Sequence, residues 1–444
     1  MQYKQRLVTA DEAVTHIKDG NRVFSGQVSS FPKELEAALV RNKDLYRDVE
    51  IVQMFSLGDV EFCRSDLTEH FSYHTLYAAE NTRRILEEKR ADFTPCYLYR
   101  IPELFRDCLI PLDVAMVQLS MPDENGYCSF GLNPECAKQV VASAPIVLAE
   151  LNDQYPYVYG DNHVHISQLD YIVETSYSLK EFIPPPITET ELLIGKHCSS
   201  LIKDGDTLQL GIGGVPNAVL ASLTDKKDLG IHSEMFSDGV VDLVEAGVIT
   251  GARKTLHKGK LVATFLLGSK KLFDFVNCNE IMEMHPVDYV NNPLTIMKNE
   301  NLVSINSCVE IDLTGQVASE SIGPRQISGV GGQVDFIRGA TLSPGGRSII
   351  AMTSTARGGK VSRIVPSLTP GAFVTTNRHD VDYIATEYGI VRLFGLSLRK
   401  RAEALISIAH PDFREELSKA SLHMYYPDES SRIKYLSRTH TKGL

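Results

Sequence analysis

The stretch Gly211-Ile212-Gly213-Gly214-Val215-Pro216 decides how this chain is expected to fold. The preceding run Thr207–Leu210 has the composition of a short strand, and Pro216 begins a run that is typical of a helix. A glycine-rich turn between a strand and a helix leaves backbone amides at the helix N-terminus, where they favour a phosphate or a developing oxyanion. The stretch therefore predicts a strand-turn-helix unit with an anion site at the turn.

A candidate nucleophile lies in a second stretch, Gly230-Ile231-His232-Ser233-Glu234-Met235-Phe236-Ser237-Asp238-Gly239. Glu234 follows a predicted strand, and in open α/β sheets ligands bind at the carboxyl ends of strands. We therefore expect Glu234 and the glycine turn to face one crevice, an arrangement suited to covalent catalysis by a carboxylate. His232 either orients this carboxylate or packs on the same sheet face, because residues i and i+2 of a strand share a face.

The remaining pattern indicates an α/β fold. Short apolar runs at 114–119, 146–150 and 348–352 predict buried parallel strands. Helix-period stretches separate them; helices are expected over 240–246, ending at Gly247, and over 398–409, ending before Pro411.

An internal echo indicates a duplicated architecture. The run 17–26 has a similar sequence 185 residues later, at 202–211. After each copy, small or polar residues lead to a proline and then to a helix-like run. We therefore expect two similar open α/β domains with mainly parallel sheets, although a chance match of helix, turn and strand stays open. The proline cluster Phe182-Ile183-Pro184-Pro185-Pro186-Ile187 predicts the boundary, giving domains 1–184 and 185–444.

Composition restricts the class of function. The 444 residues are 43% hydrophobic and 23% charged with a net charge of -11, which indicates a soluble globular protein and excludes a general nucleic-acid or membrane surface. No signal peptide or membrane-spanning run is evident, so we expect a cytoplasmic protein. The eight cysteines form no Cys-x-x-Cys pair, which argues against zinc and disulfide frameworks. Cys128, near a predicted loop, is a candidate reactive thiol.

Other motif-based functions fit less well. A dehydrogenase interpretation stays open because Glu234 falls near the distance at which the dinucleotide fingerprint has an acid, but Pro216 occupies the glycine position needed for close packing. No Gly-Lys-Ser/Thr follows the glycine turn and no Gly-x-Ser-x-Gly occurs, which excludes a Walker loop and a serine-hydrolase elbow. His163 and His165 share a strand face but lack a third ligand at recognisable spacing, so a structural or pocket role is favoured and no metal is assigned.

Three stretches, 211–219, 230–239 and Gly329-Val330-Gly331-Gly332-Gln333-Val334-Asp335-Phe336, together resemble the acetyl-CoA hydrolase/transferase family. The resemblance extends through 122–128, 152–154, 386–389 and 408–413, so it covers nearly the whole chain. It departs from the family at Met121, where a proline is usual before Pro122.

The resemblance implies a CoA-transferase that moves CoA between an acyl-CoA and short-chain carboxylates such as 4-hydroxybutyrate, butyrate and acetate. Glu234 would be the nucleophile of a ping-pong reaction through a glutamyl-CoA thioester. Coenzyme A would be a substrate, with no permanently bound cofactor and no metal. A carboxylate that is ionised at neutral pH suits this role, because it needs no general base. An acyl-CoA hydrolase using the same glutamate and a catalytically silent CoA-binding protein are the alternatives.

The resemblance also assigns roles to further residues. Amides at Gly331 and Gly332 are oxyanion candidates, and Gln27, after Gly26, is a candidate contact for the acyl group. The first domain would form the acyl or carboxylate side of the cleft, and the second would hold CoA and the glutamate. A homodimer or larger homo-oligomer is expected from the family. The residues expected to contact CoA are Gly211, Ile212, Gly213, Gly214, Val215, Val309, Gly332 and Lys360.

Overall fold

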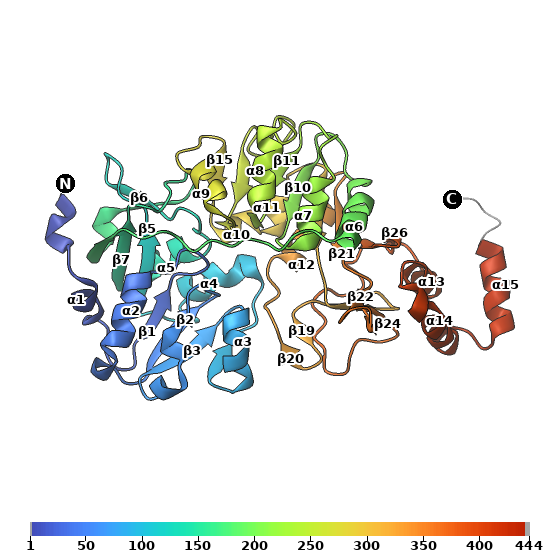
Figure 1. Ribbon diagram of the computed structural model, residues 1–444, viewed down its shortest axis with the longest axis horizontal. Helices are drawn as coiled ribbons and strands as arrows, with labels where there is room; N and C mark the ends of the chain where they lie inside the picture. The colour runs from blue at the N-terminus through green and yellow to red at the C-terminus, as the bar shows by residue number, and fades with distance from the viewer. Residues whose placement is uncertain (1, 440–444) are drawn as a thin grey trace.

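A computed structural model describes residues 2–439 and contains two large, mainly parallel sheets, each covered by helices (Figure 1). One sheet belongs to the N-terminal lobe, here residues 2–175, and the other to the C-terminal lobe, residues 189–439. Residues 176–188, which include the proline cluster, form neither strand nor helix. The α/β prediction is confirmed. The division into domains 1–184 and 185–444 stays a prediction.

The N-terminal sheet has seven strands, and each pair of neighbours is parallel. In spatial order they are β4 (Ala91–Phe93), β3 (Phe71–Thr75), β2 (Val49–Gln53), β1 (Arg22–Ser25), β5 (Val114–Leu119), β7 (Ile146–Asn152) and β9 (Tyr171–Thr175). Helices of this lobe are α1 (Ala10–Val14), α2 (Lys33–Arg41), α3 (Glu80–Glu87), α4 (Ile101–Arg106) and α5 (Ala137–Ser143). β6 (Tyr127–Ser129) and β8 (His163–His165) form a separate two-stranded antiparallel sheet.

The C-terminal sheet repeats this order. Its strands run β15 (Met282–Met284), β13 (Leu261–Ala263), β11 (Gly230–His232), β10 (Thr207–Leu210), β16 (Leu302–Asn306), β21 (Arg347–Ala351) and β25 (Tyr383–Thr386), followed by the antiparallel β26 (Gly389–Arg392). β12 (Met235–Phe236) pairs with β10 and with β14 (Phe265–Leu266). Smaller strands are β17 (Glu310–Asp312), β18 (Val317–Ala318), β19 (Ser321–Ile322), β20 (Arg325–Gln326), β22 (Thr355–Ala356), β23 (Val361–Ser362) and β24 (Ile364–Val365).

The helices of this lobe cover the sheet and then extend beyond it, at the red end of the chain in Figure 1. They are α6 (Glu189–Ser199), α7 (Gly214–Ala221), α8 (Asp238–Glu245), α9 (Lys270–Val276), α10 (Val287–Val290), α11 (Pro293–Ile296), α12 (Gln333–Leu342), α13 (Leu398–Ser407), α14 (Pro411–Tyr425) and α15 (Glu429–Thr439). None of the helices within residues 2–439 combines the length and apolar character needed to cross a membrane.

The duplication predicted from the echo is visible in the topology. β1 and β10, which end the two echoed runs, occupy the same place in their sheets, and both are followed by a helix, α2 or α7. In each sheet the order of the first seven strands reverses at this strand, which creates a topological switch point beside it. Such a point opens a crevice at the carboxyl ends of the strands, where ligands bind in α/β proteins.

Both faces of each sheet are buried, which explains why the strands read as continuous apolar runs. All six positions of β5 are buried: Ala115 and Val117 belong to one apolar cluster, and Val114 and Met116 to the cluster on the opposite face. A large apolar side chain such as Val or Met contributes about 1.5–3 kcal/mol when fully buried.

Cys128 is also fully buried, on β6, and burial raises the pKa of its thiol to about 12, so the prediction of a reactive thiol is wrong. All eight cysteines are free.

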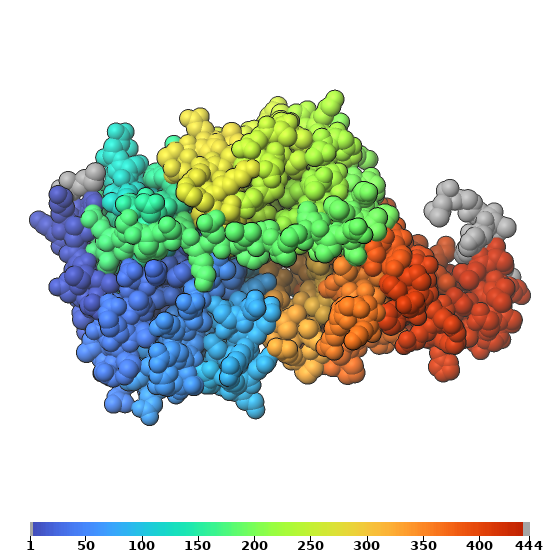
Figure 2. Space-filling view, viewed as in Figure 1, coloured from blue at the N-terminus to red at the C-terminus, as the bar shows by residue number. Residues whose placement is uncertain are grey.

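The two lobes meet along their length (Figure 2), with the segment 176–188 passing between them. Phe182 N donates to Gly268 O at 2.9 Å, and Ser29 Oγ donates to Lys180 O at 3.1 Å, so the segment is fixed to both lobes. A second contact lies near the 328–332 loop, where Arg83 Nε of α3 donates to Ile327 O at 2.5 Å. These contacts hold the N-terminal lobe against the switch point of the C-terminal sheet.

Candidate active site

Glu234 lies between β11 and β12, at the carboxyl end of the C-terminal sheet. Ser233 locks this end, because its Oγ donates to Met235 O at 2.6 Å and accepts from Leu210 N at 3.2 Å. Glu234 O accepts from Thr264 N at 3.0 Å and from Phe265 N at 3.1 Å. The main chain on both sides of the carboxylate is therefore fixed by strand pairing rather than by a flexible loop.

A cavity of about 210 Å³ opens beside Glu234, at the switch point between β10 and β16. Tyr77, which follows β3, lines it from the N-terminal lobe, so both lobes form its wall. The lining residues from the C-terminal lobe include Gly211 after β10, Asn306 and Ser307 at the end of β16, Glu234, Gly331 and Gly332. The predicted nucleophile and the second glycine loop therefore line one cavity, as expected. Of the first glycine turn, only Gly211 is among the lining residues.

Two donors hold the carboxylate of Glu234. Asn291 Nδ2 donates to Glu234 Oε2 at 2.8 Å, and the backbone amide of Gly332 also donates to this carboxylate. Gly332 precedes α12 as its N-cap, so its amide is one of those that a helix N-terminus leaves without an intrahelical partner. The same amide would be available to a negatively charged oxygen of a reaction intermediate.

Glycine is required at 332 because the carboxylate packs directly against its Cα. A Cβ at this position would lie 1.9 Å from Glu234 Oε2 and 2.4 Å from Asn291 Nδ2. Gly331 differs: its φ of +57° is left-handed, and a Cβ there would come no closer than 3.9 Å to Glu234 Oε1. Gly331 is therefore needed for backbone conformation, and Gly332 for space.

Burial raises the pKa of Glu234 to about 7, although Asn291 and the Gly332 amide each lower it. Two further carboxyls respond to its charge. Burial and the charge of Glu234 raise the pKa of Glu135 to about 8 and hold the pKa of Asp335 well above its usual range. Three carboxyls in one desolvated region cannot all ionise together, so Glu234 is the one that carries the charge near neutral pH.

Known proteins resemble this chain along almost its whole length. The model of the acetyl-CoA hydrolase/transferase N-terminal domain matches residues 1–184, and that of the C-terminal domain matches residues 268–421. The chain is 55% identical to the 4-hydroxybutyrate coenzyme A transferase of Clostridium kluyveri over 415 residues, which cover 94% of this chain and 97% of the relative. This chain belongs to the acetyl-CoA hydrolase/transferase family.

Other family relatives are similarly complete matches. The succinyl-CoA:cyclohexane-1-carboxylate CoA transferase of Geobacter metallireducens is 43% identical, with 95% of this chain and 96% of the relative covered. The crystal structure of the 4-hydroxybutyrate CoA-transferase of Porphyromonas gingivalis has a TM-score of 0.83 at 45% identity, covering 94% of this chain and 97% of that one. The dehydrogenase interpretation, which the glycine turn left open, is therefore wrong. The family is the acetyl-CoA hydrolase/transferase family that the sequence motifs resemble.

Other residues that the family resemblance assigned to CoA lie apart from the cavity lining. Ile212 is exposed in the turn, Gly213 has a φ of +110° as the N-cap of α7, and Gly214 and Val215 begin that helix. Val309 lies before β17, and Lys360 is exposed in the hairpin turn between β22 and β23. Their contacts with CoA stay predictions.

Gln27 is buried and turned toward a carboxyl of its own lobe. Its Nε2 donates to Glu135 Oε2, and Cys136 Sγ lies 3.8 Å from its Oε1. Because the charge of Glu234 acts on Glu135, Gln27 is linked to the reaction region through this second carboxyl. Its role toward the acyl group stays a prediction.

His232 acts on the helix beside the site rather than on Glu234. Its ring is fully buried, burial lowers its pKa to about 3, and its Nε2–H donates to Val290 O at 2.9 Å. Val290 ends α10 and precedes Asn291, so neutral His232 fixes the segment that holds the carboxylate. His163 and His165 lie on β8, in the two-stranded β6–β8 sheet, where no third His, Cys, Asp or Glu of the described residues joins them in a group close enough to bind a metal.

Sequence reasoning missed Asn291, Glu135, Asp335 and Tyr77. Asn291 precedes Asn292-Pro293, a local signal for the start of α11 that carries no information on catalysis. Asp335 stands within the quoted glycine-loop stretch, but its burial at 1% exposure could not be read from that pattern. Asn291 and Asp335 approach the Glu234 region from other elements of the same lobe, and Glu135 and Tyr77 from the N-terminal lobe, so only the tertiary structure reveals them.

Proposed function

We propose that this chain is a CoA-transferase that moves CoA between an acyl-CoA and short-chain carboxylates, with 4-hydroxybutyrate, butyrate and acetate as the substrates to test. The observation that carries the proposal is the Glu234 carboxylate, held by Asn291 and the Gly332 amide in a cavity at the switch point. The full-length identity to named CoA-transferases supports the same activity.

The proposed reaction has two halves. An oxygen of Glu234 attacks the thioester carbonyl, the carbon–sulfur bond breaks, and an acyl-glutamyl anhydride and the CoA thiolate form. The thiolate then attacks the glutamyl carbonyl and expels the first carboxylate, which leaves a glutamyl-CoA thioester. An incoming carboxylate repeats these steps in reverse order and leaves as the new acyl-CoA. No net proton transfer is required, so the steps need neither a metal nor a general base.

The geometry of the carboxylate supports this chemistry. With a pKa of about 7, Glu234 is less stabilised by solvent than an exposed glutamate, so its ionised form is a better nucleophile, yet a large fraction is ionised at neutral pH. Each addition step places negative charge on a carbonyl oxygen. The amides of Gly331 and Gly332, at the N-terminus of α12, are the proposed donors to that oxygen.

The assignment of the two sides of the cleft rests on the elements around the cavity. We infer that Gly211 to Val215, Val309, Gly332 and Lys360 bind CoA, because amides at the start of α7 and an exposed lysine suit its phosphates. The N-terminal domain, residues 1–184, would then face the acyl group, with Tyr77 at the cavity wall and Gln27 behind it.

The test is a half-reaction. The protein is incubated with butyryl-CoA without an acceptor, and the mass of the peptide that contains Glu234 is measured before and after acetate labelled with oxygen-18 is added. We expect a CoA adduct on Glu234 that acetate discharges to acetyl-CoA, leaving one labelled oxygen on Glu234. The label distinguishes attack by acetate from attack by water. Glu234→Gln is the control and should form no adduct.

Each other outcome has a defined meaning. Free CoA that accumulates without acceptor, with oxygen-18 entering Glu234 only from labelled water, would identify the family's hydrolase activity instead. No adduct and no turnover with acetyl-, butyryl- or 4-hydroxybutyryl-CoA, or turnover that Glu234→Gln leaves unchanged, would contradict covalent catalysis by this glutamate.

A further inference from the structure

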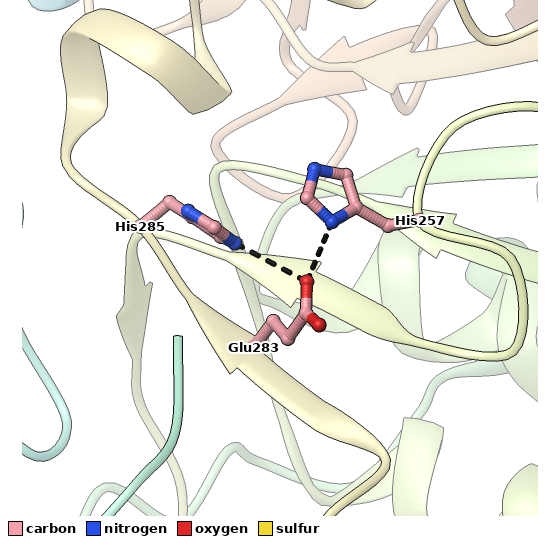
Figure 3. A group of neighbouring side chains, drawn as sticks. All are labelled: His257, Glu283 and His285. Carbon is pink, nitrogen blue, oxygen red and sulfur yellow. Dashed lines mark hydrogen bonds and ion pairs between the residues drawn. The ribbon is translucent and has the colours of Figure 1, made fainter. Parts of the chain in front are cut away.

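A second group of polar side chains lies at the β15 edge of the C-terminal sheet, next to residues 159–160 of the N-terminal lobe and separate from the cavity beside Glu234. His257, Glu283 and His285 present one nitrogen or oxygen each, and these three atoms lie within 4.8 Å of one another (Figure 3). His257 Nδ1 is 2.5 Å and His285 Nε2 is 3.3 Å from the same atom, Glu283 Oε2. We propose that His257, Glu283 and His285 form a binding site for a zinc ion.

Strand geometry explains how two of the ligands converge. Met282 and Met284 of the edge strand β15 are buried, so Glu283 and His285 both project from the opposite face, two residues apart. His257 reaches them from the loop before β13, with a left-handed backbone of φ +52° that non-glycine residues rarely adopt. Three ligands are thus brought together by two segments that are distant in sequence.

The distances suit a tetrahedral ion after a small adjustment. Zinc bonds of 2.0–2.1 Å separate neighbouring ligand atoms by roughly 3.3 Å. The His285–Glu283 separation of 3.3 Å already has this value, and the His257–Glu283 separation of 2.5 Å needs to open by less than about 1 Å. The opening requires only side-chain rotation of His257 and Glu283, which are 19% and 23% exposed.

A neighbouring phenol can orient one of the rings in either tautomer. In the structure His257 Nδ1–H donates to Glu283 Oε2 and Nε2 accepts from Tyr289 OH at 2.6 Å; a bound ion would replace the proton on Nδ1, and Nε2–H would then donate to the same phenol oxygen. Metal-binding histidines are commonly oriented by such a bond from the other ring nitrogen.

The charges around the group also favour a cation. Glu283 supplies a full negative charge, and Asp161 acts on His285 with the same sign. Lys254 is the opposing cation that acts on Glu283, but its Nζ donates to Ile231 O at 2.7 Å and to Lys260 O at 2.8 Å, and burial lowers its pKa to about 7. Two imidazoles and one carboxylate are a ligand set that zinc binds with a fourth position left for water.

The location predicts a stabilising ion rather than a reacting one. Tyr289 lies on α10, the helix whose Val290 carbonyl is held by His232 and which leads to Asn291. An ion bound to His257, Glu283 and His285 would join the 246–260 loop to β15 and, through Tyr289, to α10. Zinc should therefore raise the thermal unfolding midpoint of the full chain.

The test measures zinc binding to chelator-treated full-length protein. Cys108 and Cys278 are exposed thiols that bind zinc themselves, so every protein carries Cys108→Ser and Cys278→Ser. We expect one saturable Zn²⁺ per chain by calorimetry, and a visible Co²⁺ absorption band typical of four or five ligands. Glu283→Gln keeps a polar group between the two rings and should weaken Zn²⁺ binding at least about tenfold and abolish the rise in midpoint.

Two further variants complete the test. His285→Asn should have the same effect as Glu283→Gln, whereas the control His165→Asn, which alters a histidine of the other lobe, should bind Zn²⁺ like the parent. Circular dichroism verifies that each variant is folded. Absence of saturable binding in the parent, or equal affinity in the parent, Glu283→Gln and His285→Asn, would overturn the zinc site.

Discussion

Gly332→Ala is the substitution that tests the active-site geometry most directly. The new Cβ would lie 1.9 Å from Glu234 Oε2, whereas real Cβ atoms essentially never approach a neighbour closer than 3.0 Å. The carboxylate must therefore move by about 1 Å, away from the amide that it accepts from. The backbone of Gly332 has φ −89°, which alanine adopts without strain, so the effect falls on the side chains of Glu234 and Asn291 rather than on the backbone.

The expected loss follows from this displacement. A shift of about 1 Å in a reacting group costs roughly a hundredfold in rate, which corresponds to about 2.7 kcal/mol in the barrier. Gly331→Ala is the matched comparison, because its Cβ would stay 3.9 Å from Glu234 Oε1 but requires a left-handed alanine at φ +57°. It should lower the free energy of unfolding by about 1–2 kcal/mol and cost less activity than Gly332→Ala.

The assay is the initial rate of acetyl-CoA formation from butyryl-CoA and acetate, with urea unfolding measured on the same samples. Gly332→Ala should lower kcat about a hundredfold while the urea midpoint stays near that of the parent. A kcat within about threefold of the parent, or a loss of rate that only accompanies unfolding, would refute the assigned contact between Gly332 and Glu234.

Three further predictions concern ionisation and packing. Because burial raises the pKa of Glu234 to about 7, kcat/KM should fall as the pH is lowered through 7; a profile that is flat between about pH 5 and pH 8 would contradict this. Asn291→Ala removes a donor that lowers this pKa, so the midpoint of the same profile should move to higher pH and kcat/KM at pH 7 should fall about tenfold, whereas an unchanged midpoint would exclude the role of Asn291. Gly195→Ala would place a Cβ 2.4 Å from Ala218 O, where α6 crosses α7, and should lower the free energy of unfolding by about 1–3 kcal/mol in urea; an unchanged midpoint would show that the helices separate without cost.

The order of structure along the chain was predictable where one segment carries its own signal. The strands at 114–119 and 207–210 lie where the sequence indicated, because a strand that is buried on both faces consists mainly of apolar residues. The echo of 17–26 at 202–211 correctly indicated two similar, mainly parallel α/β sheets, and their common strand order is a finding of the structure. Helix ends were less well determined: the helix expected over 398–409 ends at Ser407, since the polar surface of a last turn tolerates several stopping points.

The ionisation state of Glu234 was not predictable in this way. A glutamate alone in sequence is expected to be ionised at neutral pH, but the closed cavity raises its pKa to about 7. The supports of the carboxylate come from elements far along the chain, Asn291 after α10 and Gly332 before α12. Likewise, the spacing Glu283-x-His285 carries no strong motif without His257, which joins it from another loop.

The sequence by itself determined the two-sheet α/β fold, the family and the candidate nucleophile. Apolar periodicity, glycine turns and ordered motifs are local patterns, which can be recognised in one stretch of sequence without knowing which other segment it contacts. Only the tertiary structure decided which groups act on that nucleophile. Desolvation, carboxyl–carboxyl repulsion and the reach of an amide donor depend on distances between segments that are far apart in the chain. Asn291 and Gly332 reach Glu234 within the C-terminal lobe, and Tyr77 and Glu135 act on the site from the N-terminal lobe, so these distances exist only in the folded protein.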